Sequence, residues 1–184
     1  AAHILQRIKS EFGVEFEKSF DLITGTSTGA IIAAGLALGI PITDIVRFYE
    51  EKGEDVFSEK NFSLWGMIKS LYKKESLKKL LAEVFGDKVL SEAKTRLLIP
   101  ATDISNGTVH VFKSNYLPEF VRDTQIKVCD AVLASCSAPI YFDPEKVGAY
   151  LLSDGGLWAN NPALTGLIEA TGKLKLPIEK VHIL

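Results

Sequence analysis

The chain has 184 residues, of which 47% are apolar and 24% charged, the balance of an ordinary globular domain. The formal net charge is −2, so no broad basic field is available to attract a nucleic acid. Cys129 and Cys136 lack the spacing of metal ligands, which favours a reduced cytoplasmic protein, and no motif calls for a metal or cofactor.

The first quarter of the chain alternates between helical and extended patterns. In order, its predicted elements are a helix over 3–12 that Gly13 ends, a strand over 20–24, a helix over 27–38, and a helix over 43–51 that Thr43 caps. Residues 22 to 43 carry no charge and are numerous enough to span a bilayer. Gly25, Gly29 and Pro41 interrupt that stretch, so we predict a short strand and a buried helix instead.

Residues 53–74 mix both charges with aromatic side chains and show no clear period. We interpret them as a flap or as short helices, and the aromatic part from Phe57 to Tyr72 as a candidate lid or membrane-facing surface. The alternative interpretation is that these aromatic side chains belong to the core.

The rest of the chain continues the alternation of strands and helices. In order, we predict a helix over 77–85, strands over 96–104 and 108–113, a helix over 128–136, a strand over 149–153, a helix that Asn161-Pro162 begins, and a strand from 181 to 184. Ser105-Asn106-Gly107 is typical of a hairpin turn between the two adjacent strands. Such an alternation indicates an α/β fold with a largely parallel central sheet.

A serine flanked by two glycines lies between the first strand and its helix, in Gly25-Thr26-Ser27-Thr28-Gly29. A sharp strand-to-helix turn exposes a serine nucleophile, and glycine is favoured two positions before and after it. The N-terminus of the helix directs free N–H groups at the same place, so the Thr28 N–H is a candidate oxyanion donor. Two alternatives are a turn that serves packing alone and a phosphate cradle, although the lysine of a Walker loop is missing.

The sequence offers two kinds of general base for such a serine. The histidines are His3, His110 and His182, and for each of them we favour a structural role. His182 follows the serine in the order of an α/β-hydrolase triad, but it lies within a predicted strand rather than in a loop.

Three aspartates are the other candidates. Asp154 ends a short apolar strand, and Gly155 and Gly156 after it allow an unusual backbone path. Asp103 also ends a strand, but it leads into the hairpin, where it can cap the turn. Asp143 precedes a proline and is interpreted as a loop residue. From these residues alone, the choice of base remains open.

Four blocks of sequence, taken in order, resemble the patatin-like phospholipases. They are FDLI followed by GTSTG at 20–29, ATDIS at 101–105, ASCSAPIYFDP at 134–144 and DGGLWANNP at 154–162. The resemblance runs from about residue 3 to residue 184. It implies a three-layer α/β/α patatin-like fold with a mostly parallel central sheet. It also implies a Ser–Asp dyad that needs neither histidine nor metal, with Ser27 as nucleophile and Asp154 as general base.

The resemblance further implies a phospholipase A type of hydrolysis, in which acyl esters of phospholipids or other lipids are cleaved through an acyl-enzyme. We therefore expect a lipid substrate and a cytoplasmic protein that contacts membranes peripherally. An isolated carboxylate is a weak base, with a pKa of about 3.9. We expect apolar neighbours to raise the pKa of Asp154, and a direct hydrogen bond between Ser27 and Asp154.

The sequence departs from the family at one point. Members carry a glycine-rich loop with an arginine upstream of the first helix, and its N–H groups form most of the oxyanion hole. This sequence begins at Ala1, inside or just before that helix. We expect residues 1–184 to form one patatin-like catalytic domain that lacks this loop and the C-terminal part, and to be a poor enzyme alone. The alternatives are a soluble esterase or thioesterase, and a catalytically impaired lipid-binding module.

Overall fold

The computed structural model describes residues 1–56, 72 and 74–184, without the side chains of 54–56. Its elements, in chain order, are α1 (Ala2–Phe12), α2 (Phe16–Ser19), β1 (Leu22–Thr24), α3 (Thr28–Ala37), α4 (Ile42–Val56), α5 (Lys74–Phe85), the 3₁₀ helix η1 (Leu90–Glu92), β2 (Arg96–Asp103), β3 (Thr108–Lys113), α6 (Val128–Ser135), β4 (Glu145–Val147), β5 (Tyr150–Asp154), α7 (Gly156–Ala159), α8 (Ala163–Ile168), the π-helix η2 (Glu169–Lys173) and the 3₁₀ helix η3 (Ile178–Lys180). The aromatic stretch that we interpret as a flap lies almost entirely outside the described residues.

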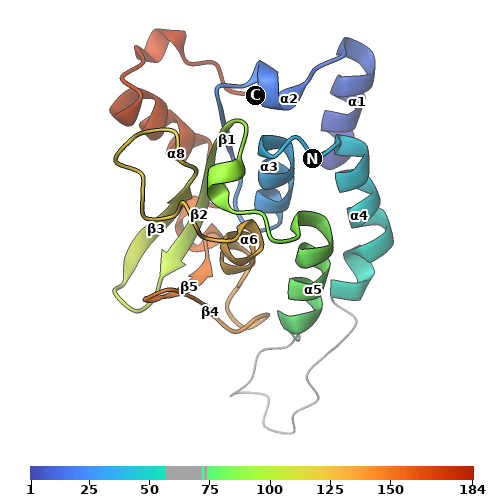
Figure 1. The fold of residues 1–184 in the computed structure, drawn as a ribbon, viewed down its shortest axis with the longest axis vertical. Coiled ribbons are helices and arrows are strands. Elements are labelled where there is room, and N and C mark those ends of the chain that lie inside the picture. The colour runs from blue at the N-terminus through green and yellow to red at the C-terminus, as the bar shows by residue number, and fades with distance from the viewer. Residues whose placement is uncertain (57–71, 73) are drawn as a thin grey trace, which may run out of the picture.

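The elements form three layers, as the sequence predicts (Figure 1). Helices α3 and α6 cover one face of the sheet, and α7 and α8 contact β2 and β1 from the other. Alternation along β1 explains this arrangement, because successive side chains of a strand point to opposite faces. Ile23 packs into the core on the α3 side, whereas Thr24 lies against Gly166 of α8. Helices α4 and α5 pack outside α3 and α6, and α1 contacts α4.

The sheet is mixed: its strand order is β1-β2-β5-β4, and β3 pairs with β2 outside this path. Strands β1 and β2 are parallel, with Ile23 opposite Leu97. The other three pairs, β2–β3, β2–β5 and β4–β5, are antiparallel. The predicted parallel pairing thus holds where the chain approaches the serine turn. The rest of the sheet differs because tight turns such as 104–107 and 148–149 return the chain directly to its neighbour.

Helix α3 is buried on nearly every side between the sheet and α4, which explains the uncharged stretch from 22 to 43. Ala30, Ala34 and Ala37 have no exposed surface. A side-chain carbon at Gly35 would lie 2.6 Å from Ile45 Cδ1, so the small residues of α3 allow α4 to approach closely. None of the helices in the described part of the chain is long and apolar enough to cross a membrane.

The sequence predictions fail at four places. Helix α4 begins at Ile42, so Thr43 lies inside its first turn and is not the N-cap; the N–H groups of Asp44 and Ile45 donate to the Pro41 carbonyl instead. Residues 181–184 form no strand in the described structure, and their apolar pattern alone is misleading. The short elements α2 and β4 are not predicted at all.

The beginning of α8 is close to the prediction. The helix starts at Ala163, directly after Pro162, and the Asn161 side chain accepts a hydrogen bond from the Ala163 N–H at 3.0 Å.

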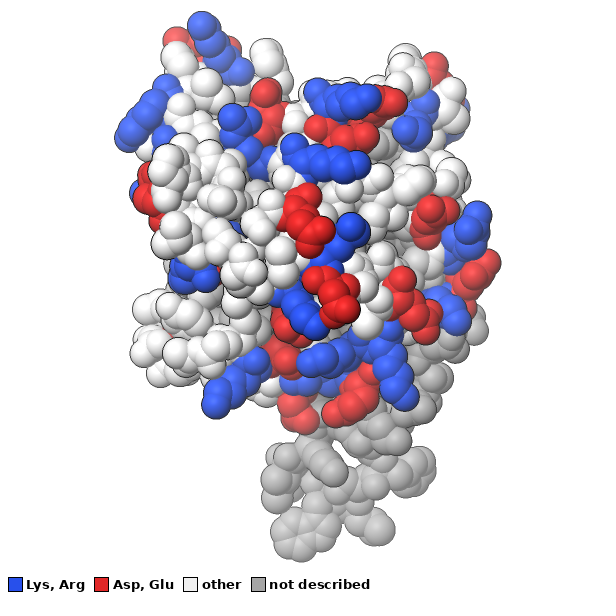
Figure 2. All heavy atoms as spheres, in the orientation of Figure 1, with Lys and Arg blue, Asp and Glu red and all other residues white. Residues whose placement is uncertain are grey.

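On the face shown in Figure 2, lysines and arginines alternate with acidic residues, so that face carries no continuous basic surface.

Candidate active site

The turn around Ser27 joins the carboxyl end of β1 to the N-terminus of α3. Ser27 has φ 55° and ψ −131°, a conformation that residues other than glycine rarely adopt. A side-chain carbon at Gly25 would lie 2.2 Å from the carbonyl oxygen of Gly29, so only glycine fits there. Gly29 differs from the sequence expectation, because a carbon added to it meets no atom within 4 Å. Steric crowding therefore requires the first glycine of the motif and not the second.

Ser27 and Asp154 are in direct contact. The Ser27 hydroxyl donates a hydrogen bond to Asp154 Oδ2 at 2.6 Å, as expected from the sequence. The other carboxylate oxygen, Oδ1, accepts the Gly156 N–H at 2.6 Å. Burial raises the pKa of Asp154 above its ordinary value, and the hydrogen bonds from Ser27 and Gly156 oppose that rise only in part.

Two hydrogen bonds hold the backbone of Asp154, and the two glycines that follow it lie in crowded positions. Its N–H donates to the Ser137 carbonyl at 2.9 Å, and its own carbonyl accepts the Thr102 hydroxyl at 2.7 Å. Directly after it, a side-chain carbon at Gly155 would lie 2.3 Å from the Pro100 carbonyl oxygen. At Gly156 such a carbon would lie 2.9 Å from Asp154 Oδ1. Both glycines are therefore needed so that the chain can pass close to β2 and to the carboxylate.

The Thr28 N–H is free to donate. Thr28 is exposed, and within the described residues its N–H has no hydrogen-bond acceptor. Its carbonyl accepts a hydrogen bond from the Tyr49 hydroxyl. Burial raises the pKa of Tyr49, so this hydroxyl keeps its proton at neutral pH. The Ser27 N–H is occupied, because it donates to Ser135 Oγ at 2.9 Å.

The histidines lie apart from these contacts. His3 is exposed on α1, 3.5 Å from Glu50. His110 is buried in β3 between the rings of Phe112 and Tyr150, with ring centroids 4.6 and 4.7 Å away. Burial, and then the Arg122 charge, lower the pKa of His110 to about 4, so it is neutral at physiological pH. His182 is exposed beyond the last helical turn, outside any strand.

Asp103 and Asp143 occupy the places that the sequence predicts for them. Asp103 accepts the N–H groups of Ser105 and Asn106 through Oδ1, and the Asn106 side chain through Oδ2 at 2.7 Å. It therefore caps the hairpin turn. Asp143 is an exposed loop residue. One site residue, Ser135, has no role in the sequence predictions: it lies within the ASCSAPIYFDP block, but no local pattern shows what it contacts.

Comparisons with known proteins show which family the chain resembles. The profile of the patatin-like phospholipase family matches residues 1–167. A cGAMP-activated phospholipase of Escherichia coli is 34% identical over 187 residues, covering 97% of this chain and 52% of the relative. A protein of the same name from Vibrio cholerae is 37% identical over 163 residues, covering 82% of this chain and 46% of the relative. Patatin-like protein 4 of Arabidopsis thaliana is 31% identical over 186 residues, covering 92% and 46%.

A solved structure shows the same fold. VipD from Legionella pneumophila superimposes with a TM-score of 0.58 at 13% sequence identity, covering 95% of this chain and 51% of VipD. The chain spans about half the length of the curated relatives described above.

Proposed function

The chain belongs to the patatin-like phospholipase family, and we propose that it hydrolyses acyl esters of membrane phospholipids, as a phospholipase of type A. In this proposal Ser27 is the nucleophile and Asp154 the general base. The observation that carries it is the 2.6 Å hydrogen bond from Ser27 Oγ to Asp154 Oδ2, between residues 127 positions apart. Acyl transfer needs a nucleophile, a base within hydrogen-bond distance of it and a donor to the oxyanion, and a helix N-terminus supplies such donors.

The first step forms an acyl-enzyme. Ser27 Oγ attacks the ester carbonyl carbon while its proton passes to Asp154 Oδ2. The negative charge that develops on the carbonyl oxygen accepts a hydrogen bond from the Thr28 N–H. The ester C–O bond then breaks, and the departing lysophospholipid oxygen takes the proton from Asp154. Burial favours this role, because the raised pKa of Asp154 makes its carboxylate a stronger base than an exposed one.

The second step releases the fatty acid. A water molecule attacks the acyl carbon, and Asp154 accepts its proton. The bond from the acyl carbon to Ser27 Oγ breaks, the Ser27 oxygen recovers a proton from Asp154, and both side chains return to their starting states. All the proton transfers pass through a single carboxylate, and neither step involves a histidine.

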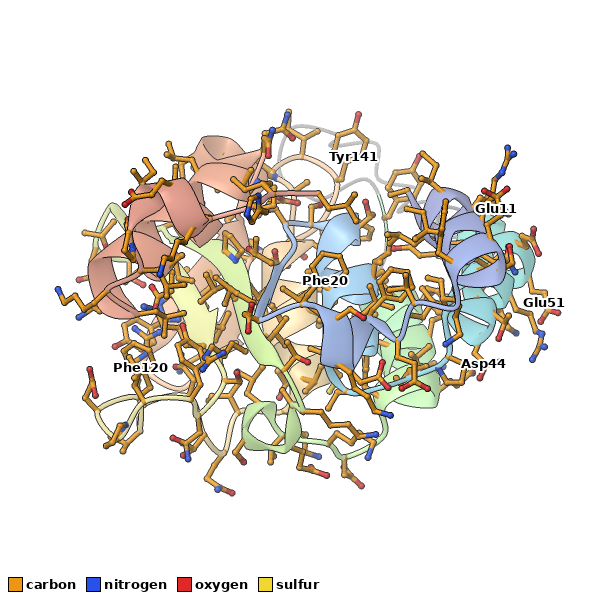
Figure 3. The ribbon with its side chains drawn as sticks, turned by 90° about the horizontal axis from the view of Figure 1, so that it is seen from above. Glu11, Phe20, Asp44, Glu51, Phe120 and Tyr141 are labelled. Carbon is orange, nitrogen blue, oxygen red and sulfur yellow. The ribbon has the colours of Figure 1, made fainter. Side chains whose placement is uncertain are left out.

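A lipid substrate is supported by exposed apolar side chains on two segments of the chain: the loop that follows Ser137, whose carbonyl accepts the Asp154 N–H, and helix α7, which follows Asp154. On the loop after α6, Ile140 is 75% and Tyr141 48% exposed; Tyr141 points outward at the edge of the molecule in Figure 3. On α7, just after Asp154, Leu157 is 56% and Trp158 38% exposed. Such side chains suit contact with acyl chains better than with water.

Relatives with the names cGAMP-activated phospholipase and cUMP-AMP-activated phospholipase suggest a regulated enzyme. We extend the proposal to activation of the natural full-length protein by such a nucleotide. Each assay is therefore run with no nucleotide, with cGAMP and with cUMP-AMP.

The test measures fatty-acid release from vesicles of phosphatidylcholine and phosphatidylglycerol by the natural full-length protein. We expect release by the wild type and its loss in Ser27→Ala, with circular dichroism as the control for folding. Cleavage of soluble esters without vesicle hydrolysis would make the protein an esterase or thioesterase. If the folded protein cleaves neither substrate with any nucleotide, the proposal fails, and vesicle binding alone would indicate a lipid-binding module.

A further inference from the structure

Ser135 is the last residue of α6, and its hydroxyl reaches two other segments of the chain. It has no exposed surface. Its Oγ accepts a hydrogen bond from the Ser27 N–H at 2.9 Å and donates one to the Pro100 carbonyl at 2.6 Å. One buried side chain therefore joins the nucleophile turn, strand β2 and the end of α6.

The contact with Ser27 matters because of the backbone conformation there. A positive φ at a residue other than glycine is sparsely populated, and it persists only where the surroundings hold it. Gly25 makes the turn sterically possible, but it does not fix the orientation of the next peptides. The Ser135 hydroxyl is the acceptor for the N–H of the residue that must present its own hydroxyl to Asp154.

The contact with Pro100 links the same side chain to the acid. The Pro100 carbonyl oxygen is the first atom that a side-chain carbon at Gly155 would meet. The Gly155 N–H in turn donates to the Ser135 carbonyl at 3.4 Å. The Ser27 N–H and the Gly155 N–H, which directly follows Asp154, thus both donate to oxygens of Ser135.

We propose that Ser135 is a positioning residue, which holds the Ser27 turn so that Oγ faces Asp154 and the Thr28 N–H stays free to donate. This proposal rests on the function proposed above in one respect: the reaction for which Ser135 positions Ser27 is the one proposed there. Because Ser135 engages the Ser27 N–H, that group is unavailable to an oxyanion. Its neighbour Thr28 then supplies the hydrogen bond from the helix N-terminus.

The test compares Ser135→Ala with Ser114→Ala in the natural full-length protein. Ser114 is a matched control: it is also buried, and its Oγ accepts the Leu97 N–H at 2.9 Å near the start of β2. We measure the rate and the final extent of Ser27 labelling by a fluorophosphonate, which needs no lipid substrate. We expect labelling of Ser135→Ala to be about 10²-fold slower but equally complete, because misplacement of a reacting atom slows attack without removing sites.

Ser114→Ala is expected to lose stability like Ser135→Ala while it labels at the wild-type rate, and Ser135→Thr, which keeps the hydroxyl, is expected to recover labelling. Wild-type labelling by Ser135→Ala, or equal slowing in both alanine variants, would overturn the proposal. Wild-type protein that labels at Ser27 but releases no fatty acid would refute the proposed function and leave this inference intact.

A second measurement uses the wild type alone and does not depend on the folding of any variant. Amide hydrogen exchange followed by NMR should show a protected Ser27 N–H and a rapidly exchanging Thr28 N–H. After labelling, the Thr28 amide should become protected by the phosphoryl oxygen. A Ser27 amide that exchanges as fast as that of Thr28 would contradict the assigned hydrogen bond.

Discussion

Asp103 and Asp154 are both buried aspartates at the ends of paired strands, since Asp154 lies opposite Ala101, two residues before Asp103. Their carboxylates nevertheless differ in chemistry. Hydrogen bonds from the Asn106 side chain and from backbone N–H groups of the hairpin lower the pKa of Asp103. Burial raises the pKa of Asp154, which receives the Ser27 hydroxyl and the Gly156 N–H.

The difference shows that burial and hydrogen-bond donors, and not position in the sheet, set the pKa of each carboxylate. Both carboxylate oxygens of Asp103 accept hydrogen bonds from its own hairpin, and the donors of these bonds stabilise its charged form. Asp154 leads into two glycines and a short helix, so few donors reach it and one oxygen remains for the serine. The chain thus places a structural carboxylate and a candidate base at the ends of two adjacent strands, β2 and β5.

The largest effect is expected when the two aspartates are neutralised in parallel. Asp154→Asn removes the proton acceptor, so we expect fatty-acid release to fall by about 10²–10⁴-fold, the usual contribution of a general base. Asp103→Asn should keep this activity but lower the free energy of unfolding, because Asn106 loses its charged acceptor. Initial rates on vesicles and urea unfolding curves measure the two effects.

This comparison has clear contrary outcomes. Full activity of Asp154→Asn would move the base elsewhere, and the histidines would have to be tested in its place. Equal loss of activity in folded Asp103→Asn would show that the hairpin acts on the reaction and is not merely capped by its aspartate.

The next effect concerns the turn that directs Ser27 toward Asp154 rather than toward any other base. Gly25→Ala places a carbon 2.2 Å from the Gly29 carbonyl oxygen, and we expect overpacking to cost about 1–3 kcal/mol or more in the free energy of unfolding. Gly29→Ala meets no atom within 4 Å, so its unfolding free energy should remain near that of the wild type. Thermal and urea unfolding of both variants give the comparison, and equal costs would contradict the geometry of the turn.

Local patterns in the sequence predict much of this fold. The helices α1, α3, α5 and α6 and the hairpin of β2 and β3 lie close to the predicted ranges. Their signals, which are apolar period, glycine ends and an Asn-Gly turn, all act within a few residues. The prediction for 181–184 fails because a strand also needs a neighbour to pair with, and the apolar pattern does not contain that information.

The candidate site divides in the same way. The Ser27 turn is visible in five consecutive residues, but the contact with Asp154 spans 127 positions and the contact with Ser135 spans 108. The residues alone favour no single base among Asp154, its rival Asp103 and His182, and the resemblance to the family makes the choice of Asp154. Gly155 is a further example: the sequence predicts a glycine there because of an unusual backbone path, whereas the structure shows that the nearby Pro100 carbonyl leaves no room for a side chain.

The smallest expected effect is also the most specific to the two aspartates, because their pKa shifts have opposite signs. The lowered pKa of Asp103 means that its contribution to stability is present above the ordinary aspartate pKa of about 3.9 and is lost as the pH falls through the folded value. The raised pKa of Asp154 means that its own contribution to stability is greatest below about 3.9 and declines as the pH rises through the folded value. Urea unfolding of wild type and of each Asn variant, from about pH 3 to about pH 7, should therefore give stability differences that change in opposite directions with pH. If both stability differences changed in the same direction with pH, the pKa values of the two carboxylates would be shifted in the same direction. Electrostatics would then not distinguish Asp103 as a cap from Asp154 as a base.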